Sequence, residues 1–466
     1  MKKLFLFLPV LLIIVTASGC QFSQSEFTFR LTDSGAELVK YTGHSLNVSI
    51  PSTFQEKPVY RIGKEAFAYS QIESVEIPSG VSEIGDRVFY WCQSLKNVNL
   101  QNDLAVIGRQ AFFANTSLTK IQLGDKVQEI QQEAFAYTNL SEISIPASVR
   151  WIGVGAFTGT NNLEFITVAQ ENTKYMSKEQ ILYNKEQTEI ILAPSKKDLS
   201  CYTIPTSVKE IADFAFNDCS SLSELHLPPG FTRIGQSAFF NCSALNKIDF
   251  PDSLEFIGDN AFQGTKWMSS QQQEYVIVNG KLLLAYRGNA AVIKVPKGIV
   301  SVSYHDVTEE TEKVRILNLS SEVQSITPGF LKAYNFDYFL VDSSNSYYSS
   351  ENTILYNKDK TVLICCPIRY NDSNFTIKEG VETINDYAFS RCITIKSVIL
   401  PKSVKEIRTG AFSSCTVLEK LVIPSEVTDI QTDAFIGSKR LTIYAEERSV
   451  AGEYARNHGI PIKQSD

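Results

Sequence analysis

The sequence predicts a β-rich repeat solenoid of about thirteen repeats of 22 to 24 residues, because a phenylalanine recurs at intervals of mostly 22 or 23 residues. Around each phenylalanine lies one template, with an isoleucine five residues before it and a small polar residue or cysteine three residues after it. A repeat of this size cannot bury its apolar face alone, so neighbouring repeats must stack and share one core. The recurring residues are Phe67, Phe89, Phe112, Phe135, Phe157, Phe216, Phe239, Phe262, Phe389, Phe412 and Phe435.

Residues 1–19 have the features of a signal peptide, with two lysines before an apolar run that is too short to span a bilayer comfortably. The segment 17–20, Ala-Ser-Gly-Cys, resembles the bacterial lipobox, in which the cysteine becomes the acylated N-terminus. An ordinary signal peptide with an incidental cysteine is the alternative. We therefore expect lipid attachment at Cys20 and a short polar tether over residues 20–26.

The net charge of the chain indicates which classes of partner it can bind. Loss of residues 1–19 removes Lys2 and Lys3 from the 44 basic residues, which leaves 42 against 51 acidic residues and a net charge of −9. Such a surface argues against a nucleic-acid partner. We expect a monomer that contacts the membrane only through its N-terminal lipid.

Each repeat is expected to contribute short strands. Apolar residues about six, nine and eleven positions after the phenylalanine form a triplet, whose last two members, such as Val98 and Leu100, alternate with polar residues. This alternation is typical of a strand with one buried face. Two further copies place Val307 and Leu331 at the phenylalanine position.

We divide the chain into an N-terminal β cap over residues 27–66, a solenoid over 67–443 and a C-terminal cap over 444–466. The C-terminal cap contains a predicted short helix at 449–459, which ends at a glycine. Caps of atypical sequence are what a solenoid needs to close its open ends.

Three inserts interrupt the period, near residues 170–205, 265–296 and 342–377. The first and third share one pattern at an offset of 173 residues, so we infer that a block was duplicated. Each insert reads as a β-hairpin, and the second has Asn279-Gly280 at its turn. We expect the hairpins to extend the sheet or project from one edge, and deletion of residues 172–194 to leave a cooperative fold.

Cysteines occupy a position that other repeats fill with serine, threonine or asparagine. Such a position suits a small group that bonds the turn backbone inside the stack, so we expect buried free thiols there. The residues are Cys92, Cys219, Cys242, Cys392 and Cys415.

The template IP..V..IG..AF..C..L..I.IP, the Tyr-Asn-Lys inserts and the Tyr-Ala segment of the C-terminal cap resemble the BspA-like, or Treponema pallidum-type, leucine-rich-repeat family over roughly residues 27–462. The resemblance implies a leucine-rich-repeat superhelix on a bacterial cell surface, with a role in adhesion and in binding host or partner cells. It supplies no universal binding residue.

The sequence offers little for catalysis. The only histidines are His44, His226, His305 and His458, in widely separated repeats, and neither a phosphate-binding glycine loop nor a nucleophile elbow occurs. We expect no enzyme, no cofactor and no metal site.

The candidate binding face is therefore the row of side chains that point outward between the buried residues of each strand. At roughly 4.8 Å per stacked strand this face extends about 60 Å, which suits an extended protein ligand. A glycan-capturing accessory protein, with Tyr175, Tyr183, Tyr348 and Tyr356 as stacking platforms, and an envelope scaffold are the alternatives. The candidate residues are Asn97, Asn99, Lys120, Gln122, Glu142, Phe165, Glu224, His226, Lys247 and Asp249.

The anchor is testable by substituting Cys20→Ser. Two or more acyl chains hold a protein stably on a membrane, whereas a chain without them is uncleaved or released. We expect fractionation of cells to show loss of the processed, membrane-bound form. Gln21, in place of the aspartate that signals inner-membrane retention, favours the outer membrane. Processed mutant protein that still partitions with membranes as wild type does would instead indicate an ordinary secreted solenoid.

Overall fold

The computed structural model describes residues 21–24, 26–100, 103–305, 313–431 and 433–464, so the signal peptide, Cys20 and Val307 lie outside it. The chain folds as a β-solenoid of about 18 turns, which confirms the predicted fold class. It divides into an N-terminal unit, Met1–Leu254 with Ala261–Ser270, and a C-terminal unit, Glu255–Asn260 with Gln271–Asp466. Each unit is described by itself.

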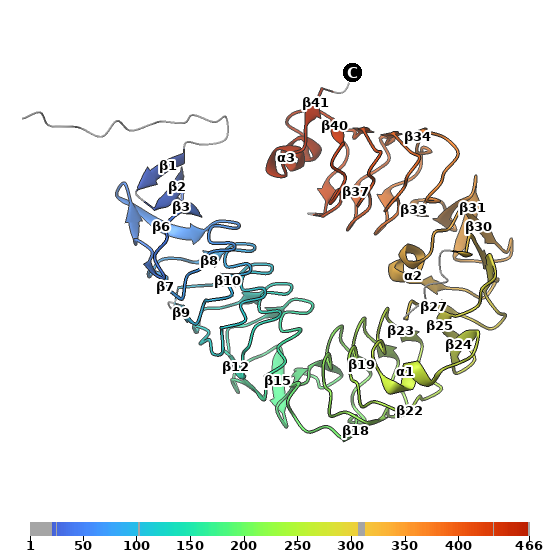
Figure 1. Ribbon diagram of the computed structural model, residues 1–466, viewed down its shortest axis with the longest axis horizontal. Coiled ribbons are helices and arrows are strands. Elements are labelled where there is room, and N and C mark those ends of the chain that lie inside the picture. The colour runs from blue at the N-terminus through green and yellow to red at the C-terminus, as the bar shows by residue number, and fades with distance from the viewer. Residues whose placement is uncertain (1–20, 25, 101–102, 306–312, 432, 465–466) are drawn as a thin grey trace, which may run out of the picture. The chain divides into compact units, whose positions relative to one another are not determined.

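Each regular coil contributes two short strands, one before its phenylalanine and one after it, and strands of successive coils pair in parallel (Figure 1). We call the first set the isoleucine row and the second the triplet row. In the N-terminal unit the isoleucine row contains β8 (Glu83–Ile84), β10 (Val106–Ile107), β11 (Glu129–Ile130), β13 (Trp151–Ile152), β17 (Glu189–Leu192), β19 (Glu210–Ile211) and β21 (Arg233–Ile234). Its triplet row contains β4 (Asn47–Ser49), β7 (Ser74–Glu76), β9 (Asn97–Asn99), β12 (Glu142–Ile145), β14 (Phe165–Val168), β18 (Cys201–Thr203), β20 (Glu224–His226) and β22 (Lys247–Asp249).

The C-terminal unit repeats this arrangement. Its isoleucine row contains β23 (Phe256–Ile257), β25 (Leu282–Tyr286), β27 (Ser301–Val302), β29 (Ser325–Ile326), β33 (Val362–Cys365), β35 (Thr383–Ile384), β37 (Glu406–Ile407) and β39 (Asp429–Ile430). Its triplet row contains β26 (Val292–Lys294), β28 (Ile316–Leu319), β30 (Tyr338–Val341), β34 (Asn374–Thr376), β36 (Ser397–Ile399), β38 (Lys420–Val422) and β40 (Thr442–Tyr444). Two short helices, α1 (Lys266–Ser270) in the N-terminal unit and α2 (Pro328–Ala333) in the C-terminal unit, replace regular turns, and α2 contains the expected Leu331.

The recurring phenylalanines form ladders of stacked rings inside the coils, as predicted. Phe112 lies between Phe89 and Phe135, with ring centroids 5.1 and 5.2 Å away. In the C-terminal unit Phe389 and Phe412 stack at 4.8 Å. These rings are almost entirely buried, so each one contributes to the packing of two neighbouring coils.

The residues two positions before and after each of the ten recurring phenylalanines from Phe67 to Phe412 adopt the left-handed conformation, and most of them are not glycine. Around Phe67 these residues are Glu65 and Tyr69, with φ of 57° and 62°. Backbone bonds to the next coil fix the turn, since Glu65 N–H donates to Asp86 at 3.0 Å and Tyr69 N–H donates to Tyr90 at 2.8 Å. These bonds offset a cost of about 1 to 2 kcal/mol for each left-handed residue.

The cysteine column consists of buried free thiols, as expected. The Cys92 thiol donates to the backbone carbonyl of Phe67 at 3.1 Å, and the Cys415 thiol donates to that of Phe389 at 2.9 Å. Ser438 makes the same bond to the carbonyl of Phe412 at 2.6 Å. Burial raises the pKa of the Cys92 thiol and so disfavours the reactive thiolate.

Both ends close the ladder with a tyrosine. At the N-terminus β2 (Phe27–Thr32) pairs with β3 (Gly35–Tyr41), and β6 (Lys57–Ile62), flanked by β5 (Thr53–Phe54), joins β3 to β8. Tyr41 stacks on Phe67 at 5.0 Å. The segment predicted as a tether supplies the edge strand β1 (Gln21–Gln24), which pairs with β2.

At the C-terminus, α3 (Val450–Asn457) lies within the predicted helix and packs Tyr454 against Phe435 at 5.3 Å. The Ser449 hydroxyl caps this helix by accepting the Gly452 N–H at 3.2 Å. Strand β41 (Ile462–Lys463) covers the edge of β40.

The inserts contain the predicted hairpins and extend the sheet, which is one of the two expected arrangements, while the tolerance of the fold to deletion of residues 172–194 stays a prediction. In the first insert β15 (Tyr175–Lys178) pairs with β16 (Ile181–Asn184), β16 pairs with β17, and β17 joins the isoleucine row beside β19. Leu182 is fully buried in the core. The insert therefore supplies a complete coil of the solenoid, which is one reason why the turns outnumber the thirteen aligned repeats.

The other inserts contribute coils in the same way. The second forms β24 (Tyr275–Val278) and β25, joined at Asn279 and Gly280, both with positive φ. The third forms β31 (Tyr348–Glu351), β32 (Ile354–Asn357) and β33. Strands β25 and β33 both join the isoleucine row of the C-terminal unit.

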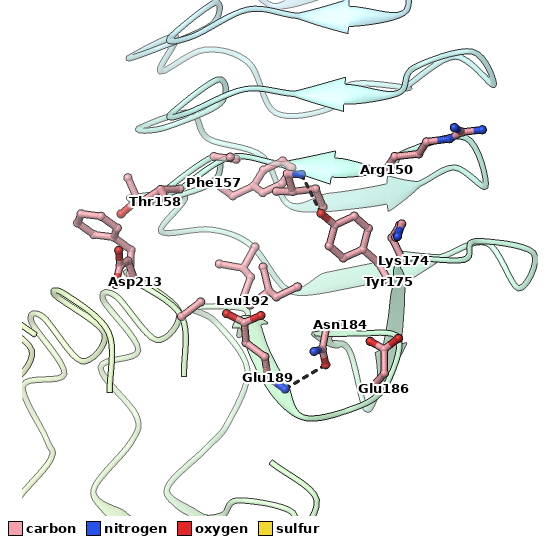
Figure 2. Close-up of a pocket in the computed structure, with 18 residues that line it drawn as sticks. Arg150, Phe157, Thr158, Lys174, Tyr175, Asn184, Glu186, Glu189, Leu192 and Asp213 are labelled. Atoms are coloured by element: carbon pink, nitrogen blue, oxygen red, sulfur yellow. Dashed lines mark hydrogen bonds between the residues drawn. The ribbon is translucent and has the colours of Figure 1, made fainter. Parts of the chain in front are cut away.

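A tyrosine side chain replaces the missing strand partner where the first and third inserts begin. The Tyr175 hydroxyl accepts the Ile152 backbone N–H at 2.9 Å (Figure 2), and the Tyr348 hydroxyl accepts the Ile326 N–H at 3.0 Å. Asn172 supports the first joint by donating to the Pro146 and Val149 carbonyls. The duplicated sequence block thus performs one structural task twice.

We predict that Phe112→Ala lowers the free energy of unfolding by about 3 to 5 kcal/mol, because it leaves a cavity between two coils. Chemical denaturation of the full chain, followed through the unfolding transition of the N-terminal unit, measures the loss of unfolding free energy. The matched control is Phe165→Ala, since Phe165 is 48% exposed and should cost much less. Equal effects at both positions would show that the ladder does not carry the stability.

We predict that Tyr175→Phe costs about 1 to 3 kcal/mol, because it leaves the Ile152 N–H without its acceptor. Tyr348→Phe should have a similar effect on the C-terminal unit. Tyr69→Phe is the control: Tyr69 is 66% exposed, so its change should stay within about 0.5 kcal/mol. Thermal melts and amide exchange at Ile152 measure the difference, and unchanged exchange would contradict the assigned role.

Candidate functional site

A groove of about 1150 Å³ lies on the triplet row of the N-terminal unit. Five of the ten predicted face residues line it, and they come from three successive coils. They are Asn97, Asn99, Lys120, Gln122 and Glu142. The sequence pattern therefore located the residues that surround this hollow, although it did not indicate that a hollow would form.

The groove forms where the triplet row is interrupted. The sheet β4-β7-β9 ends at β9, and the next pair, β12-β14, begins at β12. Between them the chain at 119–124 is not a strand. Strands in a ladder are held about 4.8 Å apart by their backbone bonds, and a coil without that pairing is not held at this spacing.

The groove has an apolar floor and a polar rim. Leu100 and Leu123 are buried beneath it, 8% and 6% exposed. The amides of Asn99 and Gln122 are exposed on the rim. Apolar contact below and amide groups beside it match the side chains and backbone of an extended polypeptide.

One exposed ion pair lies on the rim. The Lys120 ammonium stands 3.3 Å from the Glu142 carboxylate, with the two side chains 75% and 56% exposed. Exposed pairs of this kind contribute at most about 1 kcal/mol to stability, so both groups remain available to a partner.

The other predicted face residues lie outside the groove. Phe165 is exposed and stands opposite Glu142 in the register of β12 and β14. The remaining four gather on β20 and β22, where the structure brings them into contact as an ionic cluster: Glu224, His226, Lys247 and Asp249.

A second pocket, of about 370 Å³, occupies the break between β13 and the first insert (Figure 2). Tyr175, Phe157 and Leu192 line it together with Glu189 and Asp213. Burial, with the charge of Glu210 nearby, raises the pKa of Glu189. Its walls include the side chains that join the insert to the solenoid. The residues that line this pocket therefore have a structural role.

An aromatic strip was not anticipated from the sequence. Tyr69, Tyr90, Phe113 and Tyr137 follow one another at centroid distances of 5.6, 5.1 and 5.1 Å. Trp91 is 42% exposed next to Tyr90, and Tyr137 is 52% exposed. The signal was present in the sequence, because these aromatics all lie one or two positions after a repeat phenylalanine.

Three of the four tyrosines named as stacking platforms in the glycan-capturing alternative are buried, which contradicts that role for them. Tyr175, Tyr183 and Tyr356 are all less than a tenth exposed. Tyr348 is half-buried, and its hydroxyl is engaged by Ile326. Their apolar rings serve the core of the inserts, so this assignment is wrong.

Within the described residues, no helix combines the length and the apolar character needed to cross a bilayer.

No curated protein is significantly similar to the chain in sequence. Among solved structures, the pneumococcal vaccine antigen PcpA is 16% identical with a TM-score of 0.48, over 97% of this chain and 100% of that one. A leucine-rich cell surface protein from Faecalibacterium prausnitzii is 22% identical with a TM-score of 0.36, over 96% and 98%. The leucine-rich-repeat protein of T. pallidum is 25% identical with a TM-score of 0.34, over 48% and 90%.

The family assignment rests on a family model and not on these structural similarities. The model of the BspA-type leucine-rich-repeat region matches in six copies, over residues 60–187, 195–305 and 369–451. These ranges cover more than half of the chain and include all eleven recurring phenylalanines. The chain therefore belongs to the BspA-type leucine-rich-repeat family.

Proposed function

We propose that the protein is a non-catalytic, lipid-anchored surface protein whose groove binds an extended segment of a protein ligand, in adhesion or recognition. The single observation that carries this proposal is the groove with its buried leucine floor and its exposed amide rim. Amides donate and accept hydrogen bonds, so they suit a polypeptide backbone whose own groups are unpaired.

The proposed location is supported by the N-terminal sequence and by the family. Cys20 is the proposed lipid attachment point, and Gln21, in place of the aspartate that signals inner-membrane retention, favours the outer membrane. An anchored solenoid presents its long strand rows to partners in solution or on another cell.

The test places a photo-crosslinking amino acid at position 122 in the full chain, on the groove rim. The matched control carries it at Asn374, an exposed asparagine that begins the triplet-row strand β34 in the other unit. After irradiation on intact cells presented with host or neighbouring cells, we expect protein adducts at position 122 and none at position 374. Adducts at neither position, or equally at both, would contradict a groove-specific protein ligand.

The captured protein then permits a quantitative test. Asn99→Ala combined with Gln122→Ala should weaken its binding about tenfold, or ~1.4 kcal/mol, because two rim amides are lost. Asn374→Ala should leave the affinity unchanged. Calorimetry with the purified partner measures both.

A second candidate is glycan capture by the aromatic strip. Tyr69, Trp91 and Tyr137 are exposed along this strip, and their rings offer surfaces on which sugars can stack. A glycan array separates the candidates: Trp91→Ala and Tyr137→Ala should abolish glycan binding without changing the crosslinks at position 122.

A further inference from the structure

A cluster of metal-ligating side chains stands on the triplet row away from the groove, on β18, β20 and β22. Cys201 lies opposite Glu224 in the register of β18 and β20, and His226 follows two residues later on the same face. One donor atom from each of these three side chains lies within 4.8 Å of the other two. Cys201 is exposed, and Glu224 and His226 are about one-third exposed, so the cluster is open to solvent.

The imidazole of His226 is held between two carboxylates. Its Nδ1 lies 2.7 Å from an Asp249 carboxylate oxygen, and its Nε2 lies 3.0 Å from a Glu224 carboxylate oxygen. With Nδ1 facing Asp249, Nε2 is the ring nitrogen that faces the Glu224 oxygen. Two acceptors at this distance require a proton or a cation between them.

We propose that Cys201, Glu224 and His226 bind a zinc ion, with water at the fourth position. Thiolate, imidazole and carboxylate are the zinc ligands of proteins, and three protein ligands leave one site open. Zinc bonds of about 2.0 to 2.3 Å bring tetrahedral ligands to about 3.5 Å from one another, so the donors must close by roughly 1 Å. Small side-chain rotations on an exposed surface achieve this.

Asp249 is the positioning residue of this site. A histidine that binds a metal usually donates its other ring N–H to a carboxylate, which fixes the tautomer and the ring orientation. The contact between His226 and Asp249 has this arrangement and comes from the next coil.

Lys247 shows that the site attracts a cation. Its ammonium pairs with the Glu224 carboxylate. The ionised carboxylate is the form that a metal needs. Zinc would displace the ammonium, which can swing into solvent because Lys247 is 57% exposed.

The test titrates the reduced full chain with Zn²⁺ by calorimetry and with Co²⁺ as a spectroscopic probe. We expect one site at the cluster, with a thiolate-to-cobalt charge-transfer band in the near ultraviolet. Cys201→Ser should abolish this band, and His226→Gln should weaken Zn²⁺ binding at least tenfold. His44→Gln, which changes an exposed histidine far along the sequence, is the matched control and should bind as wild type does.

Two conservative variants separate a metal site from a mere surface ion cluster. Asp249→Asn should weaken Zn²⁺ binding by roughly 10- to 100-fold, as loss of such a carboxylate usually does. Lys247→Gln should bind at least as tightly as wild type, because the competing ammonium is gone. A wild-type chain that binds no Zn²⁺, or a charge-transfer band that survives in Cys201→Ser, would overturn the proposal, and circular dichroism verifies that each variant is folded.

Discussion

The stacking of one phenylalanine on the next is the interaction on which the rest of the structure depends. Phe112, for example, is buried between two neighbouring rings at about 5 Å, so it fills the interior of its own coil and covers the interior of the next. The isoleucines of the first strand row and the triplet residues complete the same core. Where the ladder ends, Tyr41 and Tyr454 cover the last rings. A coil removed from this stack would expose a complete apolar face, which is why the fold exists only as a repeat.

The ladder also requires an unusual backbone. Left-handed residues flank the regular phenylalanines, and in neighbouring coils the same place is taken by Gly155 or by Glu133. Glycine is therefore not needed, because backbone bonds to the next coil hold the turn whatever the side chain. The same bonds leave the side chains after each phenylalanine at the surface, and this placement creates the aromatic strip that includes Tyr69 and Tyr137.

The groove and the side-chain cluster arise where the regular stacking is altered or where the period aligns unlike side chains. The groove lies where the triplet row loses its pairing around Lys120. The cluster on β18, β20 and β22 arises because a period of 23 residues aligns Cys201, Glu224 and Lys247 in one column. His226 and Asp249 stand in the adjacent column. No short sequence motif contains these residues together, and the repeat period is the signal that connects them.

The sequence by itself determined the repeat, the solenoid, the buried phenylalanines and the buried thiols, because each depends on a period that recurs along the chain. The sequence also determined which strand residues point outward, so it identified Asn99 and Gln122 as residues of the outward face. Only the tertiary structure decided that the inserts are coils of the solenoid, since this depends on β17 pairing with the distant β19. The tertiary structure likewise decided that Tyr175 is buried and that the triplet row loses its strand pairing at Lys120. Pairing and burial depend on which coil each segment meets, and a local pattern does not contain that information.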